Sequence, residues 1–214
     1  MDIQNLFRKV YTHLFAGLLL TFAIAYYVSM NPNMIYNLFS GTSWLILVVA
    51  QIGVVFYLSA RIHKMSLQSA RICFYLYSFL TGLTFSTIFL VYEVTSIVYV
   101  FALTAAIFFI LAFVAPKLKI DITKMGNMLF VTLVIVLIAS IVNMFVGSES
   151  FDLGLTSIGV FLFMGYIVYD IKKIHENANR GLEIEKAAIY SAFELYIDFI
   201  NLFIRLLKLF GDRN

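Results

Sequence analysis

Long apolar stretches separated by short polar joints make up most of the chain. Seven stretches have a length between about 17 and 25 residues, which is the range for a helix that crosses a bilayer. Because an unpaired strand edge cannot face lipid, each stretch is predicted to be a transmembrane helix. The predicted spans are residues 13–30, 44–60, 72–92, 94–115, 128–146, 153–170 and 187–210. The pattern predicts an all-α polytopic membrane protein in which residues 1–214 form a single integral membrane domain.

The composition agrees with this prediction and excludes other classes. The chain is 62% hydrophobic and 13% charged, whereas about a quarter of the residues of a soluble domain are charged. Its basic residues form short clusters without interleaved aromatic residues, so nucleic acid is not an expected partner. His13, His63 and His175 are scattered without metal-ligand spacing or a nucleophile motif. We therefore expect no enzyme and no cofactor.

The basic residues are distributed unequally between the two sets of loops. All but three of the 15 Lys and Arg residues precede the first span or follow the second, fourth and sixth spans. The opposite loops carry only acids: Glu93, Glu149 and Asp152. Since Lys and Arg mark cytoplasmic loops, the N-terminus is predicted to be cytoplasmic. The exceptions lie in or after the last stretch: Arg205, Lys208 and Arg213. This stretch either crosses despite these charges, which we favour, or dips into the membrane and returns.

Polar residues in the last stretch recur at steps of three and four. They are Ser191, Glu194, Asp198, Asn201, Arg205, Lys208 and Asp212, and on a helix they form one continuous stripe. A carboxylate at the depth of Asp198 is costly unless it is paired or hydrated. Three interpretations stay open: a helix lying flat in the headgroup region, polar contacts between helices, or the lining of a water-accessible path. The narrow stripe, with acids as well as bases, favours the path.

A second carboxylate, Asp170, ends the sixth predicted span. Adjacent antiparallel helices could bring it to Asp198, although Asp170 could equally be an interfacial residue near Lys172 and Lys173. Two carboxylates in contact at low dielectric share a proton and titrate as a unit. Their deprotonated oxygens suit Ca²⁺, with too few ligands for tight binding. The hypothesis is a cation path gated by pH.

The segment from Ser191 to Gly211, SAFELYIDFINLFIRLLKLFG, closely resembles the last-helix motif of the transmembrane Bax inhibitor motif family. Three other blocks resemble the same family: GYIVYD at 165–170, LKIDITKMG at 118–126 and GLTFSTIFLVY at 82–92. Together the four blocks run from the third predicted helix to the C-terminus.

The resemblance implies a bacterial member in the inner membrane, with seven helices and the last helix at the centre. It also implies a pH-sensitive Ca²⁺ leak channel whose paired aspartates match Asp170 and Asp198, as pH sensor, gate and metal-binding carboxylates. Arg61 matches the arginine that latches the closed pair, although it could be an ordinary cytoplasmic anchor. Gln51 departs from the family, because many members carry a glutamate near this position.

We therefore expect a channel that leaks Ca²⁺ passively, with Glu194 and Asn201 as pore-side candidates. Its expected partners are the lipid bilayer, protons and Ca²⁺, which is the transported ion and not a cofactor. The rival hypothesis is a non-conducting regulator that binds other membrane proteins, such as a quality-control protease. A proton-coupled transporter is a third hypothesis, and it predicts proton movement that depends on a substrate.

Overall fold

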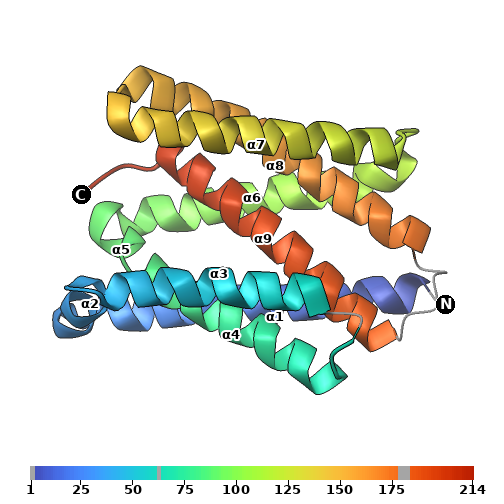
Figure 1. The fold of residues 1–214 in the computed structure, drawn as a ribbon, viewed down its shortest axis with the longest axis horizontal. Helices are drawn as coiled ribbons and strands as arrows, with labels where there is room; N and C mark the ends of the chain where they lie inside the picture. The colour runs from blue at the N-terminus through green and yellow to red at the C-terminus, as the bar shows by residue number, and fades with distance from the viewer. Residues whose placement is uncertain (1–2, 62–63, 178–183) are drawn as a thin grey trace. The chain divides into compact units, whose positions relative to one another are not determined.

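The computed structural model describes residues 3–61, 64–177 and 184–214, and all of its regular elements are helical (Figure 1). Seven helical segments are long and apolar enough to cross a membrane. They are α1 (Ile3–Ser29), α3 (Ser43–Arg61), α4 (Leu67–Phe85) with α5 (Ile88–Val91), α6 (Val94–Val114) with the 3₁₀ turn η1 (Ala115–Lys117), α7 (Ile122–Val146), α8 (Glu149–Asn177) and α9 (Ile184–Phe210). The predicted fold class is confirmed.

The structure corrects three details of the predicted helices. The first helix begins at Ile3, well before residue 13, and α8 extends beyond both ends of its predicted span. The segment Pro32–Phe39, expected only to turn, forms the short helix α2, with proline at its first helical position. The third span is interrupted between α4 and α5. There the Ser86 hydroxyl donates to the Leu83 carbonyl at 2.7 Å, and such local bonds compete with the helical ladder.

The chain packs as two compact units. Unit 1 comprises Met1–Glu93, Arg180–Tyr196 and Arg213–Asn214. Unit 2 comprises Val94–Asn179 and Ile197–Asp212. Helix α9 therefore contributes its first half to unit 1 and its second half to unit 2.

In unit 1, α1 and α4 approach each other closely at glycine positions. A Cβ atom on Gly17 would lie 2.6 Å from Cζ of Phe74, and one on Gly82 would lie 2.8 Å from the Thr21 carbonyl oxygen. Small residues allow this close approach in membrane helices, where dispersion contacts replace much of the hydrophobic driving force. Helix α3 packs on the other face of this pair, against α4.

Gln51 of α3 connects that helix to α4. Its amide nitrogen donates to the Thr81 hydroxyl at 3.4 Å, and its amide oxygen accepts from the Thr84 hydroxyl at 3.2 Å. An ionised glutamate has no donor for the first of these bonds. The contact between α3 and α4 at this position thus needs the amide.

The first half of α9 packs against α4 through aromatic rings. The ring of Tyr77 lies 5.3 Å from that of Phe193, and the ring of Phe74 lies 5.7 Å from that of Tyr196, both near perpendicular. Tyr196 is completely buried, and its hydroxyl lies 2.5 Å from the Thr21 hydroxyl of α1. Edge-to-face pairs of this kind stabilise a packed core beyond the area that they bury.

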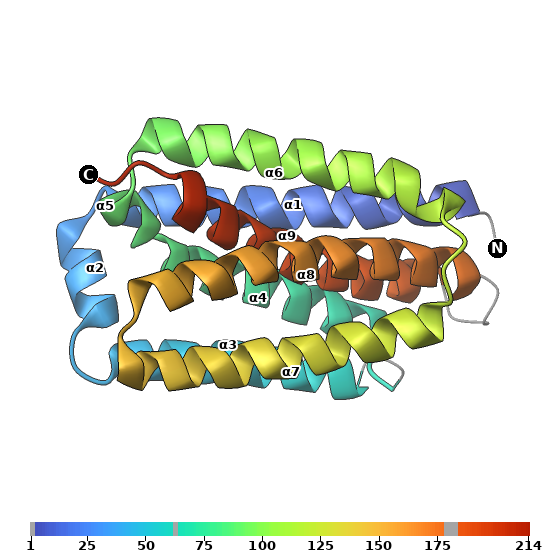
Figure 2. The ribbon, with the colours of Figure 1, turned by 90° about the horizontal axis from the view of Figure 1, so that it is seen from above.

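In unit 2, α7 and α8 run side by side (Figure 2). Leu129, Val136 and Leu162 form the centre of their contact. A Cβ atom on Gly165 would lie 2.8 Å from Cδ2 of Leu129, so the two helices pack tightly there. Gly147 ends α7 with a φ of 69°, a left-handed conformation that favours glycine and turns the chain toward α8.

Helix α6 packs against the second half of α9. The rings of Phe101 and Phe108 lie 5.4 and 5.9 Å from that of Phe199. Phe199 and the polar residues of α9 lie on different faces of that helix.

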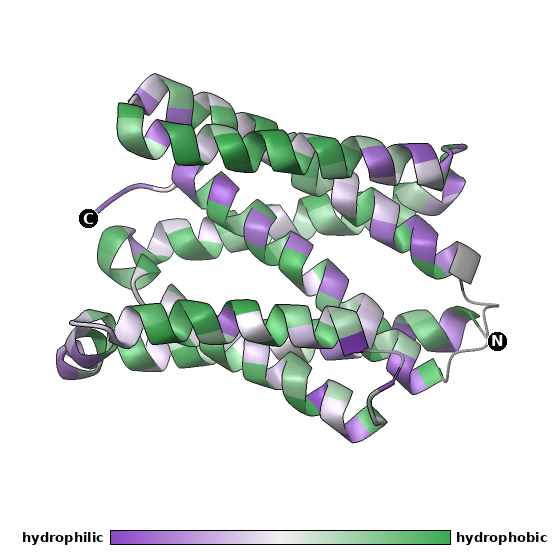
Figure 3. Cartoon of the chain, viewed as in Figure 1, coloured by the Kyte–Doolittle hydropathy of each residue, from purple (hydrophilic) through white to green (hydrophobic). Residues whose placement is uncertain are grey.

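Burial differs strongly among the helices. In α9, 67% of an 18-residue apolar stretch is buried, against 11% in α3 and in α7. Figure 3 shows the middle of α7 as continuously hydrophobic, whereas hydrophilic positions recur along α9. Exposed apolar helices are suited to lipid contact, and the high burial of α9 agrees with the predicted central position of the last helix.

Candidate functional site

One face of α8 lies opposite the polar stripe of α9 in unit 2. Its residues follow each other at steps of four and three: Asp152, Thr156, Gly159, Phe163, Tyr166 and Asp170. We call this set the α8 stripe. The facing residues of α9 are Asp198, Asn201, Arg205 and Lys208, which we call the α9 seam. The acids Asp170 and Asp198 lie toward one end of these sets, which we call the acidic end. The two helices contact each other at the other end, which we call the basic end.

Both carboxylates of the predicted pair lie at the acidic end. Asp170 is 6% exposed and Asp198 is 4% exposed, and the Oδ2 atom of Asp198 is buried. Tyr166, one turn before Asp170, lies within electrostatic range of both carboxylates. The Lys173 ammonium lies 3.9 Å from Oδ1 of Asp170. The structure therefore buries both acids in one unit, and the sharing of a proton between them stays a prediction.

The segment before α7 packs against the same end of α8. The Lys172 ammonium donates to the Leu118 carbonyl at 2.6 Å. A Cβ atom on Gly126 would lie 2.8 Å from Cε2 of Tyr169. Asp121 caps α7, since its Oδ1 accepts from the Lys124 backbone N–H at 3.1 Å. Two of the blocks that carry the family resemblance, 118–126 and 165–170, are thus in contact.

The other predicted site residues lie on different elements. Asn201 lines a pocket of unit 2, and its amide donates to the Ile197 carbonyl at 2.8 Å. Glu194 is half-buried in the first half of α9, and Arg61 is the exposed last residue of α3, both in unit 1. Their roles as pore-side residues and latch stay predictions.

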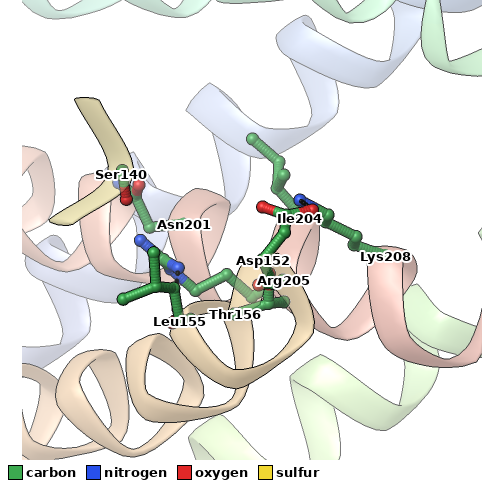
Figure 4. Close-up of a pocket in the computed structure, with 8 residues that line it drawn as sticks. All are labelled: Ser140, Asp152, Leu155, Thr156, Asn201, Ile204, Arg205 and Lys208. Atoms are coloured by element: carbon green, nitrogen blue, oxygen red, sulfur yellow. Dashed lines mark hydrogen bonds and ion pairs between the residues drawn. The ribbon is translucent and has the colours of Figure 1, made fainter. Parts of the chain in front are cut away.

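The pocket has a volume of about 210 Å³ and lies among α7, α8 and α9. It is lined by Ser140, Asp152, Leu155, Thr156, Asn201, Ile204, Arg205 and Lys208. Lys208 forms an ion pair with Asp152. Figure 4 shows Lys208 directed toward Asp152, whereas Arg205 extends toward the side where Asn201 and Ser140 lie.

The Arg205 guanidinium lies directly on α8. A Cβ atom on Gly159 would overlap it, and its Nη1 lies 3.5 Å from the Leu155 carbonyl oxygen. Its Cζ also lies 5.3 Å from the centre of the Phe163 ring, within range of a cation–π contact. The absent side chain of Gly159 therefore creates the space in which the guanidinium lies.

These contacts explain the basic residues that contradict the positive-inside pattern. Arg205 and Lys208 contact α8 in place of lipid, so their charges do not prevent a crossing. Helix α9 is unbroken over 27 residues, or about 40 Å at 1.5 Å per residue. That length exceeds the hydrocarbon core of about 30 Å. The unbroken helix is long enough to cross, whereas a segment that dips and returns would need a break. The crossing itself stays a prediction.

Sequence reasoning missed most of the pocket. Asp152 was noted only as a loop acid, while Ser140, Thr156 and Gly159 were not singled out. The spacing of the α8 stripe was the available signal, since it has the same period as the α9 seam.

Metal ligands are sparse in the described part of the chain. Among residues 3–61, 64–177 and 184–214, no group of three or more His, Cys, Asp or Glu side chains could hold a metal ion. Asp170 and Asp198 offer carboxylate oxygens, and Ca²⁺ takes six to eight oxygen ligands. The remainder would come from water and carbonyl groups, an arrangement suited to passage and not to tight binding.

A family model described as "Inhibitor of apoptosis-promoting Bax1" matches residues 3–214. The chain belongs to this family. Among its relatives is "Inner membrane protein YbhL" of Escherichia coli K12, 39% identical over 220 residues that cover 99% of this chain and 93% of the relative. An uncharacterized protein of Borreliella burgdorferi is 36% identical, and the match covers 99% of this chain and 94% of that protein.

The Bax1-inhibitor family also includes more distant bacterial relatives. An uncharacterized membrane protein of Streptococcus pyogenes serotype M1 is 31% identical, and the match covers 99% of this chain and 94% of the relative. Each of these matches covers nearly the whole length of this chain and of the relative. The chain is an integral membrane protein with inner-membrane relatives.

Proposed function

We propose that this Bax1-inhibitor family member is a pH-sensitive leak channel for Ca²⁺ and other cations, gated by Asp170 and Asp198. One observation carries the proposal: two nearly fully buried carboxylates lie on α8 and α9 of one unit, both within electrostatic range of Tyr166. Two buried acids cannot both ionise cheaply, so a shared proton is the low-energy state. Loss of that proton creates a negative site at membrane depth.

The charge state of the pair determines whether a cation can pass. In its deprotonated form the pair attracts a hard cation such as Ca²⁺. When the pair is protonated, or bridged by the Arg61 guanidinium, it blocks the path. Because protonation removes the negative charge of the pair, the flux depends on pH.

The polar neighbours of Asp198 on α9 support a path that continues away from the pair. Asn201 lies one turn beyond Asp198, and Glu194 lies one turn before it. Polar residues within membrane helices are costly, and they mark ion or proton pathways. In this proposal, the protein acts in the bacterial inner membrane with its N-terminus in the cytoplasm. Its activity is transport and not catalysis.

Ca²⁺ flux into proteoliposomes, at acidic, neutral and mildly alkaline pH, tests this function. Asp170→Asn and Asp198→Asn remove the titrating groups while they keep the side-chain volume. We expect each to bring the ratio of fluxes between the pH extremes close to one. Glu93→Gln removes an exposed carboxylate and is the matched control, with a wild-type profile.

Two results would contradict the proposal. One is a wild-type flux and pH profile in both aspartate variants. The other is no flux through the purified protein in lipid alone. If a membrane protease also co-purified with the protein in the second case, the non-conducting regulator would be the better hypothesis.

A further inference from the structure

The basic end of the α8 stripe and the α9 seam contains an excess positive charge. Arg205 and Lys208 both line the pocket, together with one carboxylate, Asp152. Asp152 already pairs with Lys208, and it is the acid that acts electrostatically on Arg205 among the described residues. One carboxylate therefore serves two cations. A half-buried cation is costly, and a bound anion would reduce that cost.

The guanidinium is held in place before any ligand arrives. Gly159 provides its space, the Phe163 ring lies beneath it at 5.3 Å, and the Leu155 carbonyl accepts from it at 3.5 Å. That hydrogen bond is long, so it satisfies the group only weakly. Arginine carries five N–H donors in a planar fork. Only the Nη1 group of this fork bonds to the Leu155 carbonyl.

The surroundings add further donors. Asn201 donates one amide hydrogen to the Ile197 carbonyl and has a second. The Lys208 ammonium has three N–H groups, and its ion pair with Asp152 uses only part of them. Figure 4 shows that the Arg205 and Asn201 side chains reach the same side of the pocket. Donors from two successive turns of α9 thus converge there.

We propose that this pocket binds a phosphate-class oxyanion, with Arg205 as the principal ligand. The arginine fork matches the oxygens of a phosphate group in a bidentate pair. The volume of about 210 Å³ lies below the roughly 300 Å³ at which pockets for larger organic ligands begin. A single phosphate group is therefore the appropriate size. The group is either free inorganic phosphate or the headgroup of a lipid, because the pocket lies at the first turns of α8 and the last turns of α9.

Binding to the purified full chain, in a nonionic detergent without phosphate, tests the proposal. The probes are inorganic phosphate by equilibrium dialysis, and phosphatidylglycerol by native mass spectrometry, with uncharged diacylglycerol as the lipid control. We expect Arg205→Gln to weaken binding at least about tenfold, since a charge-assisted hydrogen-bond pair is lost. Arg205→Lys keeps the charge without the fork and should weaken binding less. Arg213→Gln removes an exposed arginine and should leave binding unchanged.

Each outcome supports or overturns the proposal. Phosphate binding that depends on Arg205 supports a free oxyanion, and lipid binding that depends on Arg205, without phosphate binding, supports a headgroup. If Arg205→Gln fails to fold, Gly159→Ala displaces the guanidinium while every charge is kept, and binding should fall. No binding of either probe, or binding that is unaltered in all pocket variants, overturns the proposal. The result does not depend on whether the protein conducts Ca²⁺.

Discussion

The two halves of α9 have very different surroundings, although they belong to one unbroken helix. In unit 1 the first half is enclosed by aromatic rings, and its tyrosine hydroxyl meets a threonine hydroxyl of α1. In unit 2 the second half packs Phe199 against α6, brings Arg205 and Lys208 into contact with α8, and carries the buried Asp198. The first half is therefore held mainly by packing contacts, whereas the second combines aromatic packing with groups that are costly to bury.

This difference indicates where function resides. Aromatic packing and satisfied hydroxyl groups increase stability without a requirement for activity. Ionised groups at membrane depth lower stability unless every charge is compensated, so they are retained where they act on ions or ligands. The candidate groups with the most buried charge, Asp170, Asp198 and the pocket residue Arg205, all belong to unit 2.

The largest expected effect is the loss of an aromatic ring beside the first half of α9. Phe74→Ala removes a fully buried ring that contacts both Phe193 and Tyr196. We expect the free energy of unfolding to fall by about 3–5 kcal/mol, measured by denaturing titration of the protein in mixed micelles. Phe130→Ala on α7 is the control, because that ring is 64% exposed and should contribute much less. Equal losses in the two variants would remove the distinction between packed and lipid-facing rings.

A smaller effect is expected at the guanidinium of unit 2. Gly159→Ala inserts a methyl group where Arg205 lies, and overpacking typically costs about 1–3 kcal/mol. Gly154→Ala on the same helix is the matched control, because a Cβ atom there has nothing within 4 Å. That control should be neutral or stabilising by up to about 1 kcal/mol, since alanine is the better helix former.

Coupling between the two positions identifies the cause. If the methyl group acts through Arg205, the double variant Gly159→Ala with Arg205→Ala should be less destabilised than the sum of the single variants. Additive losses would show that the glycine serves α8 in some other way. They would also contradict the description of Gly159 as the space for the guanidinium.

The sequence was sufficient for the number of spans and the polar stripe of α9. Lipid leaves the helix as the only element for a long apolar stretch, so length alone locates each crossing. Spacing of three and four then places Asp198, Asn201 and Arg205 on one face. It did not predict α2, which begins with a proline at its first helical position, or the interruption at Ser86, where a side-chain bond to the backbone competes with the helical ladder.

The pocket could not be predicted without knowing how the helices of unit 2 pack against one another. Its spacing was visible in α8, but Gly159 and Phe163 do not make a polar pattern, so the stripe is only half hydrophilic. Which face of α8 meets α9 is decided by the packing of α7 and α6 on the other faces. The partner of Asp152 follows from that packing and not from any local signal.

The smallest expected effect concerns an ionic contact in unit 1. At the start of α9, Glu185 pairs with Lys9 of α1 and with Arg71 of α4, the latter at 3.0 Å. All three side chains are between 26% and 45% exposed, and exposed ion pairs contribute about 0.2–1 kcal/mol each. Glu185→Gln removes both pairs and should therefore lower the free energy of unfolding by about 0.4–2 kcal/mol. The difference should shrink at high salt because ions screen exposed charges.

Glu93→Gln is the control for this ionic contact, since it removes an exposed carboxylate of the same unit. Its stability should match the wild type at low and at high salt. A loss in Glu185→Gln as large as that in Phe74→Ala, and insensitive to salt, would mean that charge holds the first half of α9. The contrast between a half of α9 stabilised by packing and a half that carries charge would then not hold.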